Sequence, residues 1–190
     1  MSTLVADASV EGRVRTFALT SLFLALFMEL LDATIVNVAL PSIEKSLGAS
    51  GGEQQWMIAA YTLALAVTLM TGARLGDIFG RKRLFIIGLV GFTVCSALCG
   101  LAQNPGMLIA SRALQGCAAA MMIPQVLSSI QVMYKPTERG AAMASFSALA
   151  GLAAVSGPIL GALLTEADLF SWGWRTIFLV NIPVGIFSVV

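Results

Sequence analysis

The chain has 190 residues, of which 58% are hydrophobic and 11% are charged, and its mean hydropathy is +0.90. A soluble domain usually carries about 25% charged residues, because charge keeps its surface in contact with water. This composition therefore excludes an ordinary water-soluble domain and indicates an all-α integral membrane protein. The formal net charge of +1 favours no particular partner, and no nucleic-acid partner is expected.

The first 16 residues are polar, and residues 17–190 are mostly apolar. The apolar run that follows residue 16 is too long for the core of a signal peptide and lacks a small-residue cleavage pattern. We therefore interpret 1–16 as a cytoplasmic tail and 17–190 as a six-helix transmembrane bundle, with its first helix kept in the mature protein.

Six apolar stretches are long enough to cross a bilayer core, which takes roughly 20 residues of helix. Helices are required because lipid offers no partner to backbone N–H and C=O groups. The stretches are expected at 17–40, 55–75, 84–102, 106–130, 140–164 and from 174 onwards. The sixth is still apolar at Val190, so we expect the sequence to be truncated within this helix.

Lys and Arg concentrate in every second segment that connects the apolar stretches. One set of segments is rich in these residues: Arg13, Arg15, Arg81, Lys82, Arg83, Lys135 and Arg139. The intervening connections hold only Lys45 and Arg175. Because Lys and Arg concentrate in cytoplasmic loops, the pattern predicts a multi-pass protein of the cell membrane with a cytoplasmic N-terminus.

Three ionisable residues interrupt the apolar stretches: Glu29, Asp32 and Arg112. Charges inside a membrane are costly and default to functional hypotheses. Glu29 and Asp32 are three residues apart and share a helix face. Asp32 precedes Pro41 by nine residues and Arg112 follows Pro105 by seven, so their expected depths match. If the first and fourth helices are neighbours, a carboxylate and a guanidinium can meet.

Such a pair suits proton coupling. A nearby Arg lowers the proton affinity of a carboxylate, and moving that Arg or binding a cationic substrate changes this affinity. This is a physical basis for exchanging a proton for a cation. A purely structural intramembrane ion pair is the alternative, and Glu29 is also open to a structural role or to snorkelling.

The three cysteines, Cys95, Cys99 and Cys117, lie inside apolar runs. Cys95 and Cys99 are one helical turn apart, but the favoured interpretation is small packing residues rather than a disulfide or metal pair. With no histidine and no cysteine cluster, no metal site is predicted. We find no nucleophile–base pair or phosphate-binding loop, so no enzymatic activity is expected.

Two stretches break the apolar pattern. In 72–83, Gly76 and Gly80 suit a tight turn, and Asp77 lies close enough to Arg81 for a charge relay. The expected fifth helix is crowded with small residues, which allow close helix packing in lipid. Within it Gly157 precedes Pro158, which removes a backbone hydrogen bond and is expected to kink the helix. Ordinary close packing is the alternative to a role in closing a transport pathway.

From about residue 22 to 187 the chain resembles the major facilitator superfamily, specifically its fourteen-helix drug:proton antiporters. The stretch 31–41 is similar to the first-helix motif of that branch, with Asp32, Asn37 and Pro41 at motif positions. The resemblance implies the N-terminal half of the major facilitator fold. It also makes Asp32 a candidate for proton coupling.

Three further stretches carry the resemblance. Residues 73–82 resemble the superfamily's cytoplasmic loop, which is implicated in stabilising the outward-facing state; Leu75, Asp77, Gly80, Arg81 and Lys82 match, and Ala73 replaces a Gly. Residues 112–116 resemble a fourth-helix motif whose Arg is implicated in proton transfer; Arg112, Gln115 and Gly116 match. Residues 157–161 resemble the antiporter motif of exporters, with Gly157, Pro158 and Gly161 in place.

The resemblance implies a multidrug efflux antiporter, of the kind that confers antibiotic resistance, driven by the proton gradient without a cofactor. Its expected partners are the lipid bilayer, a small-molecule substrate, protons, and a missing C-terminal half or a second copy. Candidates for an apolar binding cavity are Phe27, Met28, Trp56, Tyr61 and Met121. Two alternatives stay open: an exporter of one endogenous metabolite, and a non-transporting or partner-dependent half-transporter.

Overall fold

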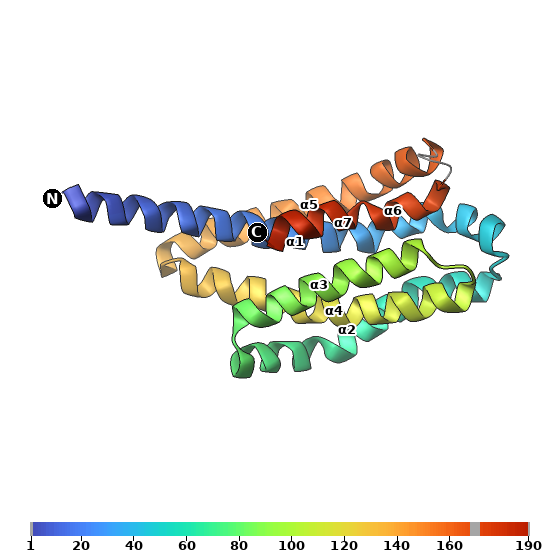
Figure 1. Cartoon of the computed structure of the whole chain (residues 1–190), viewed down its shortest axis with the longest axis horizontal. Helices are drawn as coiled ribbons and strands as arrows, with labels where there is room; N and C mark the ends of the chain where they lie inside the picture. Colours follow the sequence, from blue (N-terminus) through green and yellow to red (C-terminus); the bar gives the residue numbers. More distant parts are fainter. Residues whose placement is uncertain (1, 168–171, 190) are drawn as a thin grey trace.

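The structure, a computed structural model, describes residues 2–167 and 172–189. Its helices run back and forth along one long axis (Figure 1). In chain order they are α1 (Ser2–Leu47), α2 (Gly51–Phe79), α3 (Arg81–Gly100), α4 (Pro105–Met133), α5 (Pro136–Glu166), the 3-10 turn η2 (Gly173–Arg175), α6 (Thr176–Leu179) and α7 (Asn181–Val189). The predicted all-helical membrane bundle is confirmed.

Within the described residues, five helices are long and apolar enough to cross a membrane: Leu19–Leu47 of α1, and α2, α3, α4 and α5. The sixth predicted stretch is not one continuous helix, because α6 ends at Leu179 and α7 begins at Asn181. Pro183 has no N–H to donate to the carbonyl of Leu179, which accounts for a break at this point.

The predicted end of the first helix was wrong. The helix does not stop at residue 40 but continues through Pro41 to Leu47. It also begins at Ser2, so the backbone of the predicted tail is helical and continuous with the first span. The prediction took the helix to end with the apolar stretch 17–40, yet a helix need not stop where its apolar stretch stops.

Local signals fix the other turns. Ser50 caps α2, because its hydroxyl accepts from the backbone N–H of Glu53 while the Glu53 carboxylate accepts from the Ser50 N–H. Asn104 caps α4 and Pro105 occupies its first turn. Gly80 separates α2 from α3 with a φ of 94°, a conformation that other residues rarely adopt.

The helices form two layers (Figure 1). One contains α5, α1 and the α6–α7 segment; the other contains α2, α4 and α3. In the second layer α4 packs against both α2 and α3, while contacts of α1 with α4 and of α3 with α7 join the layers. Gly72 allows a close approach of α2 to α4, since an added Cβ would overlap the carbonyl oxygen of Ala120.

The buried apolar side chains gather in two clusters along the bundle. One includes Met28, Tyr61 and Phe92, and the other includes Leu31, Met57 and Phe178. Met28 and Leu31 are three residues apart on α1, so the clusters meet at that turn. Glu29 and Asp32 lie on the same turn, at the boundary between the two apolar clusters.

Candidate functional site

The site begins with two carboxylates on α1. Glu29 is 3% exposed and Asp32 is fully buried. Helix α4 brings Arg112 and Gln115 to the same place, and both are buried. The structure thus unites Glu29, Asp32 and Arg112, the three intramembrane charges of the sequence.

Asp32 is satisfied by donors from two other helices. Arg112 forms a salt bridge with its Oδ2 through Nη1. Gln115 Nε2 donates to Oδ1 at 3.1 Å, and Asn181 Nδ2 of α7 donates to the same oxygen at 2.8 Å. A buried carboxylate is tolerated only when it is paired and hydrogen-bonded, and Asp32 meets both conditions.

Arg112 is enclosed by acceptors and aromatic rings. Its Nη1 also donates to Gln115 Oε1 at 2.9 Å, and its Nε donates to the carbonyl of Met57 at 3.3 Å. The guanidinium carbon lies 4.2 Å from the centroid of the Tyr61 ring and 5.9 Å from that of Phe178. Stacking over ring faces stabilises a cation that has left water.

Glu29 is less well satisfied than Asp32. The hydroxyl of Tyr61 donates to its Oε1 at 2.7 Å. Its Oε2 is buried and has no hydrogen-bond partner. One carboxylate of the pair is therefore enclosed by donors, and the other keeps an unpartnered oxygen within reach of the same cluster.

Two residues of this network were missed by the sequence analysis. Ser96 of α3 is buried; its Oγ accepts from Asn181 at 2.8 Å and from Gln115 at 3.3 Å, and donates to the carbonyl of Phe178 at 2.9 Å. Asn181 links α7 to Asp32. A polar residue within an apolar stretch was the available signal for each. Tyr61, expected only as a cavity-lining aromatic, is a hydrogen-bond donor here.

The glycines of the fourth- and fifth-helix motifs pack against α2 and α1 close to the network. Gly116 and Gly157 are packing contacts: a Cβ on Gly116 would overlap the Tyr61 carbonyl oxygen, and one on Gly157 would overlap Thr34 Oγ1. Gly161 packs on Ile35, and Pro158 is exposed. The α5 motif thus abuts the α1 turn that follows Asp32.

Asn37 and Pro41 are not part of the network. Both are exposed on α1, and Asn37 donates to the carbonyl of Thr34 on its own helix. Among the candidate cavity residues, Met28 and Tyr61 are buried, while Trp56 is 55% exposed. The structure therefore divides the first-helix motif into a buried acid and an exposed stretch.

The 73–82 motif covers the C-terminal end of α2 and the turn to α3. Asp77 and Lys82 are exposed, and Gly80 supplies the turn. Arg81 donates to the carbonyl of Ser128 on α4 at 3.4 Å, and the described side chains show no ion pair between Arg81 and Asp77. Gly76 packs against Gln125 of α4 rather than forming the turn.

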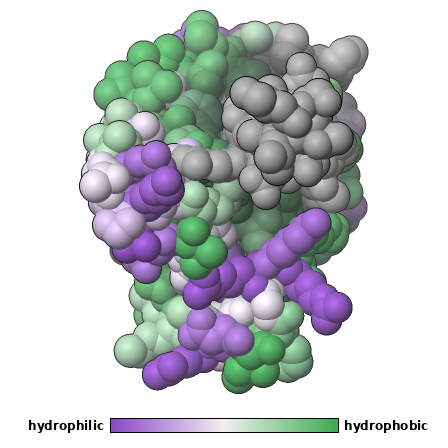
Figure 2. Space-filling model, turned by 90° about the vertical axis from the view of Figure 1, so that its left-hand side faces the viewer, coloured by the Kyte–Doolittle hydropathy of each residue, from purple (hydrophilic) through white to green (hydrophobic). Residues whose placement is uncertain are grey.

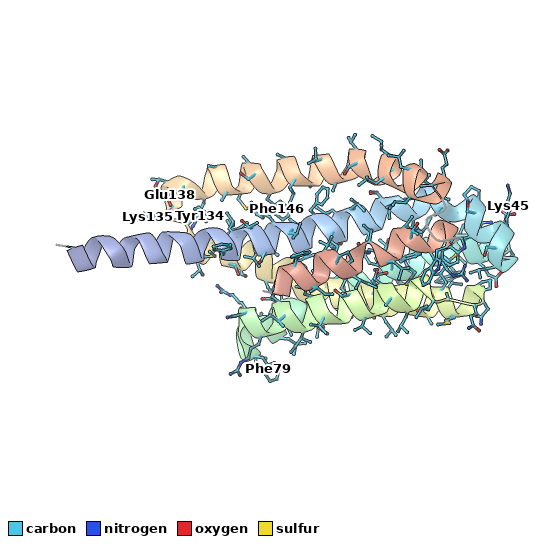
Figure 3. The ribbon with its side chains drawn as sticks, turned by 45° about the horizontal axis from the view of Figure 1, so that its top comes forward. Lys45, Phe79, Tyr134, Lys135, Glu138 and Phe146 are labelled. Atoms are coloured by element: carbon cyan, nitrogen blue, oxygen red, sulfur yellow. The ribbon has the colours of Figure 1, made fainter. Side chains whose placement is uncertain are left out.

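Charged side chains lie at both ends of the bundle. Phe79, Lys135 and Glu138 lie at one end and Lys45 at the other (Figure 3). The end with the 80–83 and 134–139 segments presents a concentration of hydrophilic side chains among apolar ones (Figure 2). The 80–83 and 134–139 segments at this end include Arg81, Lys82, Arg83, Lys135 and Arg139, which the sequence analysis assigned to one side of the membrane.

Residues 22–190 match the sequence profile of the Major Facilitator Superfamily. The chain belongs to the Major Facilitator Superfamily. Members of this superfamily are multi-pass membrane transporters and not enzymes, in agreement with the sequence prediction.

Curated relatives of the chain are transporters or resistance proteins by name. The chain is 51% identical over 163 residues to the probable actinorhodin transporter of Streptomyces coelicolor, covering 86% of this chain and 28% of that protein. It is 41% identical over 175 residues to the puromycin resistance protein pur8 of Streptomyces alboniger, covering 92% and 34%. Against the probable multidrug resistance protein EmrY of Escherichia coli it is 41% identical over 166 residues, covering 87% and 32%. The chain thus spans about a third of the length of these relatives.

The fold is shared with solved Major Facilitator transporters. The inward-facing, unoccupied crystal structure of a bacterial homologue of the human lysosomal transporter Spinster matches with a TM-score of 0.77 and 23% identity, covering 92% of this chain and 42% of that one. At 23% identity this likeness establishes the fold of the bundle and does not identify a substrate.

Proposed function

We propose that this chain is the N-terminal half of a transporter that exports hydrophobic, often cationic compounds in exchange for protons. The observation that carries the proposal is the buried contact of Asp32 with Arg112, between the two apolar clusters. An intramembrane ion pair is costly to keep, and such pairs mark ion and substrate pathways. One relative, the tetracenomycin C resistance and export protein of Streptomyces glaucescens, is named for export, and this name supports the direction of transport.

The exchange step follows from charge balance at Asp32. With Arg112 in place, the carboxylate is paired and has no need of a proton. When α1 and α4 shift, Asp32 loses its counter-charge and takes up a proton. Return of Arg112, or arrival of a cationic substrate, releases that proton, so one positive charge replaces another. Glu29 is the second carboxylate facing the cation.

Replacing the acid without changing its size tests this step. Asp32→Asn keeps an amide oxygen for Gln115 and Asn181 but removes the charge. In inside-out vesicles carrying the native gene product, a pH gradient should no longer drive accumulation of a fluorescent cationic dye. Glu44→Gln, an exposed carboxylate on the same helix, is the matched control and should leave dye uptake unchanged. Unchanged pH dependence of the Asp32→Asn variant would sink the proposal.

A second candidate is the export of one specific endogenous metabolite. The specific observation is that relatives are named for single products, the probable actinorhodin transporter and the tetracenomycin C resistance and export protein of Streptomyces glaucescens. Competition separates the two candidates. A broad exporter is inhibited by several unrelated hydrophobic cations, whereas a dedicated exporter is inhibited by one metabolite and poorly by dyes.

We also propose that transport needs a second six-helix half and that the N-terminus is cytoplasmic. The fraction of the relatives' length that the chain spans supports the first point, and the Lys and Arg of the 80–83 and 134–139 segments support the second. A cysteine placed at Lys82 should resist labelling from outside intact cells, which tests the topology.

The mass of the protein in native membranes tests the need for a second half. An antibody against residues 1–16 should detect a band well above 19.9 kDa. A band at 19.9 kDa would leave pairing of two chains as the source of activity.

A further inference from the structure

One side chain on α2 contacts both the second acid and the central cation. The Tyr61 hydroxyl donates to Glu29 Oε1 at 2.7 Å, and the face of its ring lies 4.2 Å from the guanidinium carbon of Arg112. Tyr61 is 3% exposed, so its contacts with Glu29 and Arg112 are shielded from water. Through this residue Glu29, on α1, is linked to the Arg112–Asp32 pair.

Helix α4 fixes the position of Tyr61. An added Cβ on Gly116 would overlap the Tyr61 carbonyl oxygen, so the two helices touch at this turn. One turn earlier on α2, the carbonyl of Met57 accepts from Arg112 Nε at 3.3 Å. The Tyr61 ring is thus held by the helix that carries Arg112, while its hydroxyl reaches across to α1.

The Glu29 carboxylate and the Tyr61 hydroxyl can change together when Glu29 binds a proton. Glu29 Oε2 is buried without a partner, so it is the open position for a proton in this cluster. A phenol hydroxyl can donate to a carboxylate or accept from a carboxylic acid. A proton on Oε2 leaves Oε1 as the acceptor for the Tyr61 hydroxyl but removes the negative charge that strengthens this hydrogen bond, so it weakens the hold on the ring beneath Arg112. The charged and titratable groups facing Glu29 are Tyr61 from α2, Asp32 from α1 and Arg112 from α4.

We propose that Tyr61 is a positioning residue that couples proton exchange at Glu29 to the Arg112–Asp32 pair. The proposal rests on the proton-driven export proposed above and adds a second proton-binding carboxylate and the residue that links it to the first. In this arrangement Asp32 and its donors hold α1, α4 and α7 together in one state. Glu29, with its unpartnered oxygen, accepts the proton that loosens them.

Removing the hydroxyl alone tests the link. Tyr61→Phe keeps the ring face under Arg112 and deletes the donor to Glu29. In inside-out vesicles carrying the native gene product, the midpoint of the pH profile of dye export should be displaced by about 1 pH unit, since a hydrogen bond to a charged group is worth at least that much. The KM for the dye should change less than about twofold, because the ring and Asp32 remain. Tyr134→Phe, the same change outside the site, should leave the midpoint in place.

A double variant separates coupling from a merely structural effect. In a Glu29→Gln background, which cannot bind the proton, Tyr61→Phe should cause no further displacement of the midpoint. An unchanged profile in Tyr61→Phe or in Glu29→Gln overturns the inference, and so does an additive displacement in the double variant. If Tyr61→Phe does not reach the membrane, an unchanged pH profile of Glu29→Gln still overturns the inference. Absence of pH-driven export by the wild type is a different result, and it would overturn the proposed function itself.

Discussion

Charged residues occupy two contrasting regions of this bundle. Asp32 and Arg112 are buried at its centre and are surrounded by donors and acceptors from α1, α2, α4 and α7. Asp77 and Lys82 lie at the α2–α3 turn, where their side chains are exposed. The residue types are nearly the same, but the first pair exists only because its partners are in place. The second set is free to interact with whatever lies beyond this bundle.

The difference separates stability from function. A buried ion has lost its hydration, so its partners must replace what water supplied. An exposed ion keeps its water and contributes little to the fold. Substitutions at the centre should therefore damage folding and transport together, and substitutions at the turn should affect transport alone.

The largest effect is expected from Arg112→Gln. The change leaves Asp32 buried with no counter-charge, and breaking one side of a buried pair costs about 3–5 kcal/mol of unfolding free energy. Thermal unfolding in detergent, followed by a thiol-reactive dye, suits this chain because Cys99 is buried. The unfolding temperature should fall sharply relative to the wild type.

The matching double variant shows whether the loss comes from the unpaired charge. Asp32→Asn combined with Arg112→Gln removes both ions and keeps groups that can hydrogen-bond to Gln115. Much of the lost stability should return, while dye export stays absent. If the double variant is as unstable as the single one, the cost lies in lost packing around Arg112 and not in charge.

Much of this centre was predictable because charge in lipid is conspicuous. Asp32 and Arg112 stand out in apolar stretches, and helix counting placed them at one depth. Their neutral partners did not stand out. Ser96 and Asn181 carry no charge, and their importance depends on α7 packing against both α1 and α3, which no local pattern gives.

The fold divides in the same way. The number, order and helical character of the stretches follow from the demand of lipid for satisfied backbone groups. The course of α1 through Pro41 does not follow from that demand, and the break before Asn181 has a local cause in Pro183 that hydropathy alone does not reveal. These two departures from the prediction lie on α1, which carries Asp32, and at the start of α7, which donates to Asp32 through Asn181.

An intermediate effect is expected where α5 meets α1. Gly157→Ala places a methyl group on Thr34 Oγ1, and overpacking of this kind costs about 1–3 kcal/mol. Gly151, on the same helix, has nothing within 4 Å of an added Cβ. Gly151→Ala should be neutral or stabilising by about 0.5–1 kcal/mol, because Gly is a poor helix former. Equal unfolding temperatures for the two variants would show that the contact of Gly157 with α1 does not limit stability.

The smallest effect on folding is expected from Asp77→Asn. The carboxylate is exposed, and surface substitutions usually change stability by less than about 0.5 kcal/mol. Its unfolding temperature in detergent should match the wild type, while dye export should fall, because the resemblance assigns this loop to stabilising one state of the complete transporter. Glu138→Gln, at the α4–α5 turn of the same end, tests whether loss of any charge there has the same result. A large drop in the unfolding temperature of Asp77→Asn would mean that Asp77 acts through the fold. Equal losses of export in Asp77→Asn and Glu138→Gln would mean that it acts through net charge. Either result would remove the contrast between the two regions, because neither needs a specific contact of Asp77.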